Sequence, residues 1–458
     1  MNHEGKARCG WLAAALLASA GLASAQVLQV PGYCIRRIPV GHEITGIAHA
    51  PGGAFGDDVY LCTNGAVTRV DLDSGAVSSF ATGLATGTGR PSGAAFDTGV
   101  LGTGHLYVIQ NLETKGLAEV HPDGSVVTFS AGGTLFSCND VVIPEPGGPF
   151  GSFAYVTNGT FNLGASISRV DPAQVNSTFH PGTGFKTIIG LDWPKPGSAF
   201  GNALFVGEYT DKLLYRVGSS GNTTPFPNAG PAFGQIPEDL AFGTPAGAFG
   251  DFLYVTTADT RKVVRVSSAG VSVDFVTGLQ AMNGYNGDLA FTVDGEALLL
   301  ADGNNLVVIS KEPWVSTYCV AKTTSCGTLP AISSTGMPSS TATSGFVVTA
   351  TGTKAQKFGL LLYTDRGPAS LPFQGGTLCL VSQNLRRSVA IGDSTGTPPA
   401  CDGTMSIDMN AFAQDLLGGN PAAYLKIAGT QINCQFWGRD TLANGSLLSD
   451  ALVYGICL

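Results

Sequence analysis

The sequence predicts an all-β fold, and three observations lead to this prediction. Gly accounts for 63 of the 458 residues, whereas charged residues make up only 12%. Runs rich in Val, Thr, Tyr and Phe are short and are bounded by Gly, Pro, Asn and Asp, which is typical of strands joined by tight turns. An eleven-residue motif also recurs at a nearly constant interval. Such an interval indicates a repeat architecture in which each unit packs on its neighbours.

The clearest copies of the motif begin with Pro and end with an aromatic residue followed by an aliphatic one. They read PGGAFGDDVYL from Pro51, PGGPFGSFAYV from Pro146, PGSAFGNALFV from Pro196 and PAGAFGDFLYV from Pro245, and looser copies begin at Thr98 and Val293. The aligned residues of the six copies are Tyr60, Tyr107, Tyr155, Phe205, Tyr254 and Leu299, separated by 47, 48, 50, 49 and 45 positions. This period predicts a β-propeller of six blades.

Each repeat supplies the strands of one blade. An inner strand such as ITGIAHA (from Ile44) precedes the Gly-rich turn, and a second strand follows it. The third and fourth strands form a hairpin with a Gly at the turn in four of the repeats. The sixth repeat stops at Ser310 without a fourth strand, and CIRRIPVGHEITG from Cys34 matches the missing register. We therefore expect an N-terminal strand to close the ring and to cover the edge strands.

The succession of an inner strand GIAHA or DLAF, a Gly-rich turn, and then LYV and RV resembles the six-bladed NHL-repeat and gluconolactonase-like propellers, a superfamily that includes senescence marker protein-like members. The resemblance covers roughly residues 30–310. Its motifs are typical of the architecture and of no single activity. Gluconolactonase-like enzymes carry a Glu in an EGP-type context and an Asp in a PDG-type context, where this chain has HEITG and PEDLAF or YNGDLAF.

The ends of the chain carry different signals. Residues 1–25 combine Lys6 and Arg8 with a short apolar run and Ala23-Ser24-Ala25, the layout of a secretory signal peptide. We expect this segment to be removed, the propeller to span residues 26–312, and a second β-rich domain to span residues 313–458. The protein should be exported, to the periplasm or the extracellular space. No later stretch approaches the ~20 apolar residues of a membrane span.

The second domain is predicted to be a small β-sandwich-like unit with disulfides. Its YC…C, GTLCL and QFWGRD stretches resemble a C-terminal module of bacterial secreted proteins. Six cysteines in an exported domain of this size indicate three disulfides, and sequential pairing is the simplest of the fifteen connectivities. The pairs would be Cys319–Cys326, Cys379–Cys401 and Cys434–Cys457. The three remaining cysteines of the ring leave at least one thiol unpaired.

The charge of the chain restricts its partners. Asp and Glu number 33 against 24 Lys and Arg, which gives a formal net charge of −9. An acidic chain without basic clusters is not expected to bind nucleic acid or an anionic membrane surface. The expected partner is an extracellular ligand or protein whose identity the sequence does not give.

Candidate site residues lie where the inner strands begin, because these positions converge on one mouth of a propeller channel. Asp140, Asp239 and Asp288 occupy one column of the repeat alignment, where the other blades have Gly46, Gly93 and Gly190. The three aspartates, together with Asn139 and Glu238, offer the oxygen ligands that Ca²⁺ prefers. Acidic residues at strand entries also serve turns, which is the competing interpretation. The further ligand-binding candidates at this mouth are His42, Glu43, Arg90, Lys186 and Asn286.

Two functions follow from these residues. The first is an exported binding or interaction scaffold without catalytic activity, because no complete catalytic motif is present. The second is a divalent-metal-dependent hydrolase of the gluconolactonase-like type, in which Asp140, Glu238, Asp239 and Asp288 hold the ion. His42 near Arg90 also resembles the base and cation of quinone-dependent sugar dehydrogenases, which is a third and more remote alternative.

Overall fold

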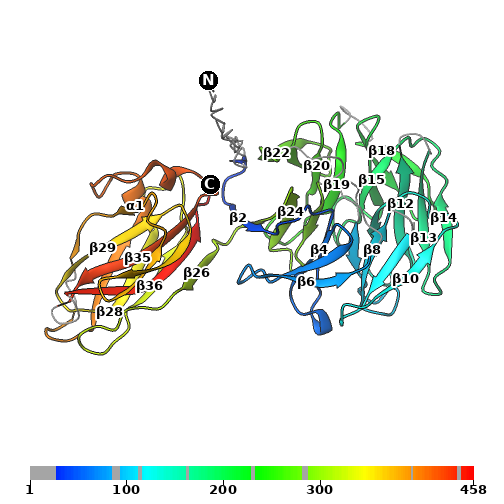
Figure 1. Ribbon diagram of the computed structural model, residues 1–458. Helices are drawn as coiled ribbons and strands as arrows, with labels where there is room; N and C mark the ends of the chain where they lie inside the picture. The colour runs from blue at the N-terminus through cyan, green and yellow to red at the C-terminus, as the bar shows by residue number, and fades with distance from the viewer. Residues whose placement is uncertain are drawn as a thin grey trace, which may run out of the picture.

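The computed structural model describes residues 27–84, 93–111, 116–160, 164–227, 233–280, 287–392, 396–440 and 445–458. The predicted signal peptide lies outside these residues. Nearly all regular structure is β, as predicted, and Figure 1 shows a ring of sheets at one end of the molecule and a smaller β-rich unit at the other. None of the helices in the described part is long and apolar enough to cross a membrane.

The ring contains six antiparallel sheets, each built from consecutive strands of the described residues. The first three sheets are β3 (Gly46–His49), β4 (Val59–Thr63), β5 (Ala66–Val70) and β6 (Val77–Thr82); β7 (Ala94–Phe96), β8 (Leu106–Gln110), β9 (Gly116–Val120) and β10 (Val126–Ala131); and β11 (Cys138–Val142), β12 (Ala154–Thr160), β13 (Gly164–Val170) and β14 (Asn176–His180). The last three are β15 (Ile188–Asp192), β16 (Leu204–Glu208), β17 (Leu213–Val217) and β18 (Thr223–Phe226); β19 (Pro237–Phe242), β20 (Leu253–Thr257), β21 (Lys262–Val266) and β22 (Ser272–Thr277); and β23 (Leu289–Phe291), β24 (Ala297–Asp302) and β25 (Asn305–Ser310). A short 3₁₀ helix, η1 (Gly53–Phe55), lies in the turn between β3 and β4.

The N-terminal segment joins two of these sheets. β2 (Cys34–Pro39) pairs antiparallel with β25, with Cys34 opposite Ser310 and Pro39 opposite Asn305, so it supplies the fourth strand of the sixth sheet. β1 (Val27–Leu28) pairs with β22 and extends the fifth sheet, which the sequence did not predict. The edges of two neighbouring sheets are therefore covered by one segment.

The hydrophobic core of the ring is divided into clusters between consecutive sheets. Six clusters of buried residues each draw on two adjacent sheets. One of them joins the sixth sheet, through Ile38 and Leu299, to the first sheet, through Ile47 and Leu61. A blade thus buries both faces only against its neighbours, which explains why the motif is repeated.

The Phe and Tyr of the repeated motif form one structural unit. Tyr155 donates a hydrogen bond from its hydroxyl to the carbonyl of Phe150 at 2.6 Å, and the two rings meet edge to face at 5.5 Å. Tyr60 and Tyr254 make the same bond to the residue five positions earlier. The fourth repeat has Phe205 in place of Tyr. There the Arg216 guanidinium donates to the corresponding carbonyl, that of Phe200, at 2.9 Å. In three blades the motif therefore ties the Gly-rich turn to the second strand, and in the fourth blade the third strand, β17, does so instead.

The C-terminal residues form two facing sheets and a hairpin. The larger sheet has the order β26 (Val315–Tyr318), β36 (Ser446–Gly455), β35 (Gln431–Arg439), β29 (Phe358–Thr364) and β32 (Arg386–Arg387), with β33 (Ile391–Gly392) also on β29. The smaller one contains β27 (Ala331–Gly336), β28 (Phe346–Thr353) and β34 (Gly403–Asp408), and the hairpin contains β30 (Pro368–Phe373) and β31 (Gly376–Leu380). α1 (Met409–Ala413) and η2 (Ala423–Lys426) are short. A single cluster that includes Phe346, Met405, Phe436 and Tyr454 fills the space between the sheets, which gives the predicted sandwich-like form.

Three disulfides are present, but the predicted sequential pairing is wrong. In the described residues the bonds are Cys34–Cys457, Cys319–Cys379 and Cys326–Cys401, and the buried Cys62, Cys138 and Cys434 form no disulfide. Sequence proximity misled the assignment because the bonded residues are 423, 60 and 75 positions apart and are brought together only by the fold. Cys34–Cys457 ties the closing strand of the ring to the last residues of the chain. Disulfides of this kind are typical of oxidising compartments.

Candidate functional site

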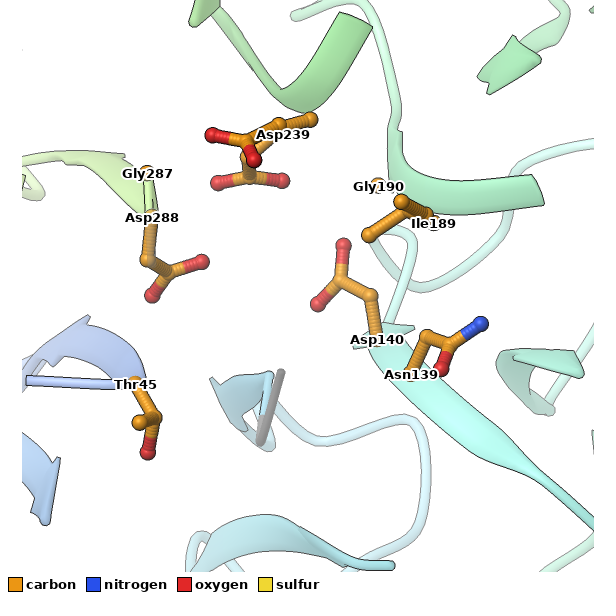
Figure 2. A pocket seen from close by; sticks show the side chains of 9 residues that line it. Thr45, Asn139, Asp140, Ile189, Gly190, Asp239, Gly287 and Asp288 are labelled. Carbon is orange, nitrogen blue, oxygen red and sulfur yellow. The ribbon is translucent and has the colours of Figure 1, made fainter. Parts of the chain in front are cut away.

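The side chains of Asp140, Asp239 and Asp288 point toward one another (Figure 2). Asp140 lies on β11, Asp239 on β19, and Asp288 immediately before β23. All three line a small cavity of about 10 Å³, enough for one water-sized particle. The other residues that line it are Thr45, Asn139, Ile189, Gly190, Glu238 and Gly287. The structure therefore brings together all five predicted metal-binding residues.

Each aspartate also connects its sheet to the next one. Asp140 accepts a hydrogen bond from the amide of Leu191 at 2.9 Å, and Asp239 accepts one from the amide of Leu289 at 2.7 Å. The glycines of the same repeat column make room for these carboxylates. A Cβ on Gly93 would lie 1.9 Å from Oδ1 of Asp140, and one on Gly190 would lie 2.6 Å from Cα of Asp239. The column contains both Asp and Gly because the Asp carboxylate on one sheet occupies the space that a side chain at the Gly of the adjacent sheet would need.

Burial controls the protonation of these acids. Desolvation raises the pKa of Asp288 to about 8, and the charge of Asp140 adds to this effect. The pKa of Asp239 is raised well above its ordinary value by desolvation, by the charge of Asp288 and by a hydrogen bond between the two carboxyl groups. Desolvation and the charge of Asp239 likewise raise the pKa of Asp140. The protonated form is therefore favoured in acids this close and this buried unless a cation compensates their charge.

Glu238 and Asn139 differ in how far their hydrogen-bonding capacity is used. The Asn139 amide donates to the carbonyls of Gly159 and Ile188 at 2.9 and 2.8 Å, so it joins neighbouring sheets. Oε2 of Glu238 is buried and has no hydrogen-bond partner among the described residues. Desolvation raises the pKa of Glu238 to about 8, with a smaller contribution from the charge of Asp259. Gly287 leaves space for this carboxyl, because a Cβ there would lie 2.6 Å from Oε2. Glu238 is thus the unsatisfied group of the small cavity.

A second and larger cavity opens where the inner strands end. Its volume is about 540 Å³, and all six inner strands contribute to its lining. Asp140, Asp239 and Asp288 line this cavity as well, so the three carboxyl groups lie between the two spaces. The prediction placed the site only at the beginnings of the strands and therefore missed this larger opening.

Four further titratable residues and one tryptophan of the larger cavity were not predicted. They are His49, Glu145, Asp192, Trp193 and Lys195. Asp192 accepts a hydrogen bond from the amide of Phe242 at 2.7 Å, and burial raises its pKa. Desolvation lowers the pKa of His49, which favours its neutral form. The signal was present in IIGLDWP: a strand alternates faces, so Asp192 shares a face with Gly190.

Of the remaining predicted residues, His42, Glu43 and Lys186 do not join the aspartates. His42 is exposed and Glu43 is half-buried, and neither lines one of the two cavities. Lys186 pairs with Asp211 at the surface. Arg90 and Asn286 lie outside the described residues.

The chain is similar to several solved propeller structures over about three fifths of its length. Virginiamycin B lyase from Staphylococcus aureus matches 61% of this chain and 99% of its own, with 13% identity and a TM-score of 0.41. A gluconolactonase from Xanthomonas campestris matches 60% and 89%, with 14% identity and a TM-score of 0.46. An auxiliary nutrient binding protein from Bacteroides ovatus matches 61% and 77%, with 13% identity and a TM-score of 0.46.

These structures include the gluconolactonase-like type that the repeats resemble, but their identities and TM-scores are too low to transfer an activity. No protein-family model matches the chain. No curated protein matches it either. The fold of the ring rests on its own sheets and clusters, and the site rests on its own geometry.

Proposed function

We propose that the protein is an exported binding scaffold that takes a cationic group, such as a primary ammonium, into the larger cavity of the ring. The observation that carries this proposal is the position of Asp140, Asp239 and Asp288 at the bottom of a cavity of about 540 Å³. Among the described residues, the lining also contains Glu145 and Asp192, and Lys195 is its one Lys or Arg. An ammonium group would compensate the carboxylates that burial and mutual repulsion otherwise keep protonated.

Two probes of the same length test this proposal. Hexane-1,6-diamine carries two ammonium groups, and hexane-1,6-diol replaces them with hydroxyls. We expect calorimetry to show saturable binding of the diamine, at least tenfold tighter than any binding of the diol, with release of protons as the acids ionise. Equal binding of the two probes, or no binding of the diamine, would refute a cationic ligand.

Variants locate the binding in the ring. Asp239→Asn and Asp288→Asn keep the shape of the side chain but remove the charge, so each should weaken diamine binding at least tenfold. Asp73→Asn is the matched control, because Asp73 is exposed on an outer turn. Unchanged affinity in both cavity variants would place the diamine elsewhere.

A second candidate function is a Ca²⁺-dependent hydrolase of the gluconolactonase-like type. The unpartnered Oε2 of Glu238 favours it, because a buried orphan oxygen beside three other carboxyl groups suits a cation. Glu238, Asn139, Asp140, Asp239 and Asp288 would hold the ion. In the described residues these carboxylates form no group whose ligand atoms all lie within 4.8 Å of one another. They would therefore have to approach when the ion binds.

Bound Ca²⁺ would polarise the carbonyl of a lactone or ester. The thermal midpoint in Ca²⁺ against EDTA tests this candidate, together with lactone hydrolysis followed in a pH-stat. A midpoint that rises with Ca²⁺, and fails to rise in Glu238→Gln, would support the site. An unchanged midpoint and no hydrolysis would leave only the binding function.

A further inference from the structure

His105, Glu119 and His121 form a cluster on the second sheet, away from both cavities of the ring. One ligand atom from each of the three residues lies within 4.8 Å of the other two, and in the described residues no other group of three or more His, Cys, Asp or Glu side chains does so. We propose that this cluster is a binding site for a divalent transition metal, with Zn²⁺ as the best match. The site is independent of the function proposed for the cavities.

The strand geometry explains why the three side chains meet. Glu119 lies on β9 and His121 follows two residues later, so both side chains project from the same face. His105 directly precedes β8, the strand that pairs with β9. The imidazole rings of His105 and His121 face each other at a centroid distance of 4.4 Å and an angle of 32°. Two imidazoles and one carboxylate therefore converge from adjacent strands.

The distances bracket those of a tetrahedral site. Nδ1 of His105 lies 2.7 Å from Oε1 of Glu119, and Nε2 of His121 lies 4.0 Å from Oε2. Ligands about 2.0–2.1 Å from a tetrahedral Zn²⁺ are roughly 3.3 Å apart. The His105–Glu119 pair must open by about 0.6 Å and the His121–Glu119 pair must close by about 0.7 Å, which side-chain rotations allow. The metal would replace the hydrogen bond between His105 and Glu119.

The surroundings also suit a metal. Nε2 of His121 is buried and has no hydrogen-bond partner among the described residues, so this lone pair or proton is unused. The Tyr107 hydroxyl donates a hydrogen bond to Oε1 of Glu119 at 3.4 Å and lies 2.9 Å from the Thr103 hydroxyl. Tyr107 therefore helps to orient the carboxylate. Such support of a ligand by its neighbours is characteristic of metal sites. The side chains of His105 and His121 are 23% and 35% exposed, which leaves access for a water as fourth ligand.

The ligand types determine which metal is expected. Imidazole nitrogen and one carboxylate oxygen suit Zn²⁺, Cu²⁺ or Ni²⁺, whereas Ca²⁺ and Mg²⁺ require mostly oxygen ligands. Affinity should therefore follow the order Cu²⁺ above Zn²⁺, with no measurable binding of Ca²⁺ at this cluster.

The test is calorimetric titration of the metal-stripped full chain with ZnCl₂. We expect one equivalent of Zn²⁺ to bind, and Co²⁺ in its place to give the visible absorption of a four-coordinate ion. His121→Gln and Glu119→Gln should each weaken binding at least about 100-fold, because each removes one of three protein ligands. Glu296→Gln is the matched control, since Glu296 is exposed in the turn that precedes β24, and the Zn²⁺ affinity of this variant should equal that of the wild type.

Two results would overturn the proposal. One is the absence of saturable Zn²⁺ binding in the wild type. The other is retention of wild-type affinity in folded His121→Gln and Glu119→Gln. Because His121 is partly exposed, its replacement should fold even if Glu119→Gln does not, and circular dichroism of each variant verifies this. Neither result depends on diamine or Ca²⁺ binding in the ring.

Discussion

Replacement of Asp288 by Asn should change how the stability of the protein depends on pH. Desolvation raises the pKa of Asp288 from its ordinary 3.8 to about 8 in the folded state. Between these values the folded protein keeps a proton that the unfolded chain releases. The contribution of this proton to the free energy of unfolding is therefore complete below about pH 4 and is lost as pH rises toward about 8.

The expected magnitude follows from linkage. One retained proton changes the free energy of unfolding by about 1.4 kcal/mol per pH unit, or about 2.7 kcal/mol between roughly pH 5 and pH 7. Asn has the shape of the protonated acid but does not titrate. The wild type should therefore lose about 2.7 kcal/mol more than Asp288→Asn across this interval. Asp239 stays in the variant but loses the charge and the hydrogen bond of Asp288, so the difference in slope reports the coupled pair.

The assay is urea denaturation in EDTA across this pH interval, followed by tryptophan fluorescence. Asp73→Asn serves as the control and should keep the wild-type slope. Parallel pH profiles for the wild type and Asp288→Asn would show that Asp288 is ionised in the folded protein. That result would refute the prediction that burial keeps this carboxyl group protonated.

Three further predictions concern the framework. Tyr155→Phe should destabilise the protein by about 1–3 kcal/mol, because the carbonyl of Phe150 loses its buried partner; a change below the error of chemical denaturation would contradict this. Gly190→Ala should cost about 1–3 kcal/mol or more in the same measurement, since its Cβ would overlap the neighbouring sheet, and unchanged stability would show that the sheets can separate. Alkylation in urea without reductant should label Cys434 and leave Cys457 in a disulfide with Cys34; a labelled Cys457 in peptide mass maps would refute the observed pairing.

Much of the ring could be predicted because the features that define each repeat involve residues close together in the sequence. The Phe–Tyr unit, the Gly-rich turn and the alternation of the strands all act within one repeat, so aligned copies reveal them. The pairing of β2 with β25 was also predicted, because the sixth repeat lacks a strand that the N-terminal segment supplies. β1 was missed because two paired residues leave no periodic signal.

The site was predicted only in part, for a physical reason. The column that holds Asp140, Asp239 and Asp288 could be found because it has the same register in each repeat. The cavity at the other end of the strands depends on how the sheets tilt and how wide the channel becomes, and one sequence contains no direct measure of either. The pairing of Cys34 with Cys457 depends similarly on how the two parts of the chain pack.

The most direct test of the central claim is a crystal structure of the protein soaked with hexane-1,6-diamine near neutral pH. We expect one ammonium nitrogen within hydrogen-bonding distance of the carboxyl groups of Asp239 and Asp288, in the larger cavity. A diamine bound only elsewhere on the protein, with those two carboxyl groups still hydrogen-bonded to each other, would contradict a cationic ligand in this cavity.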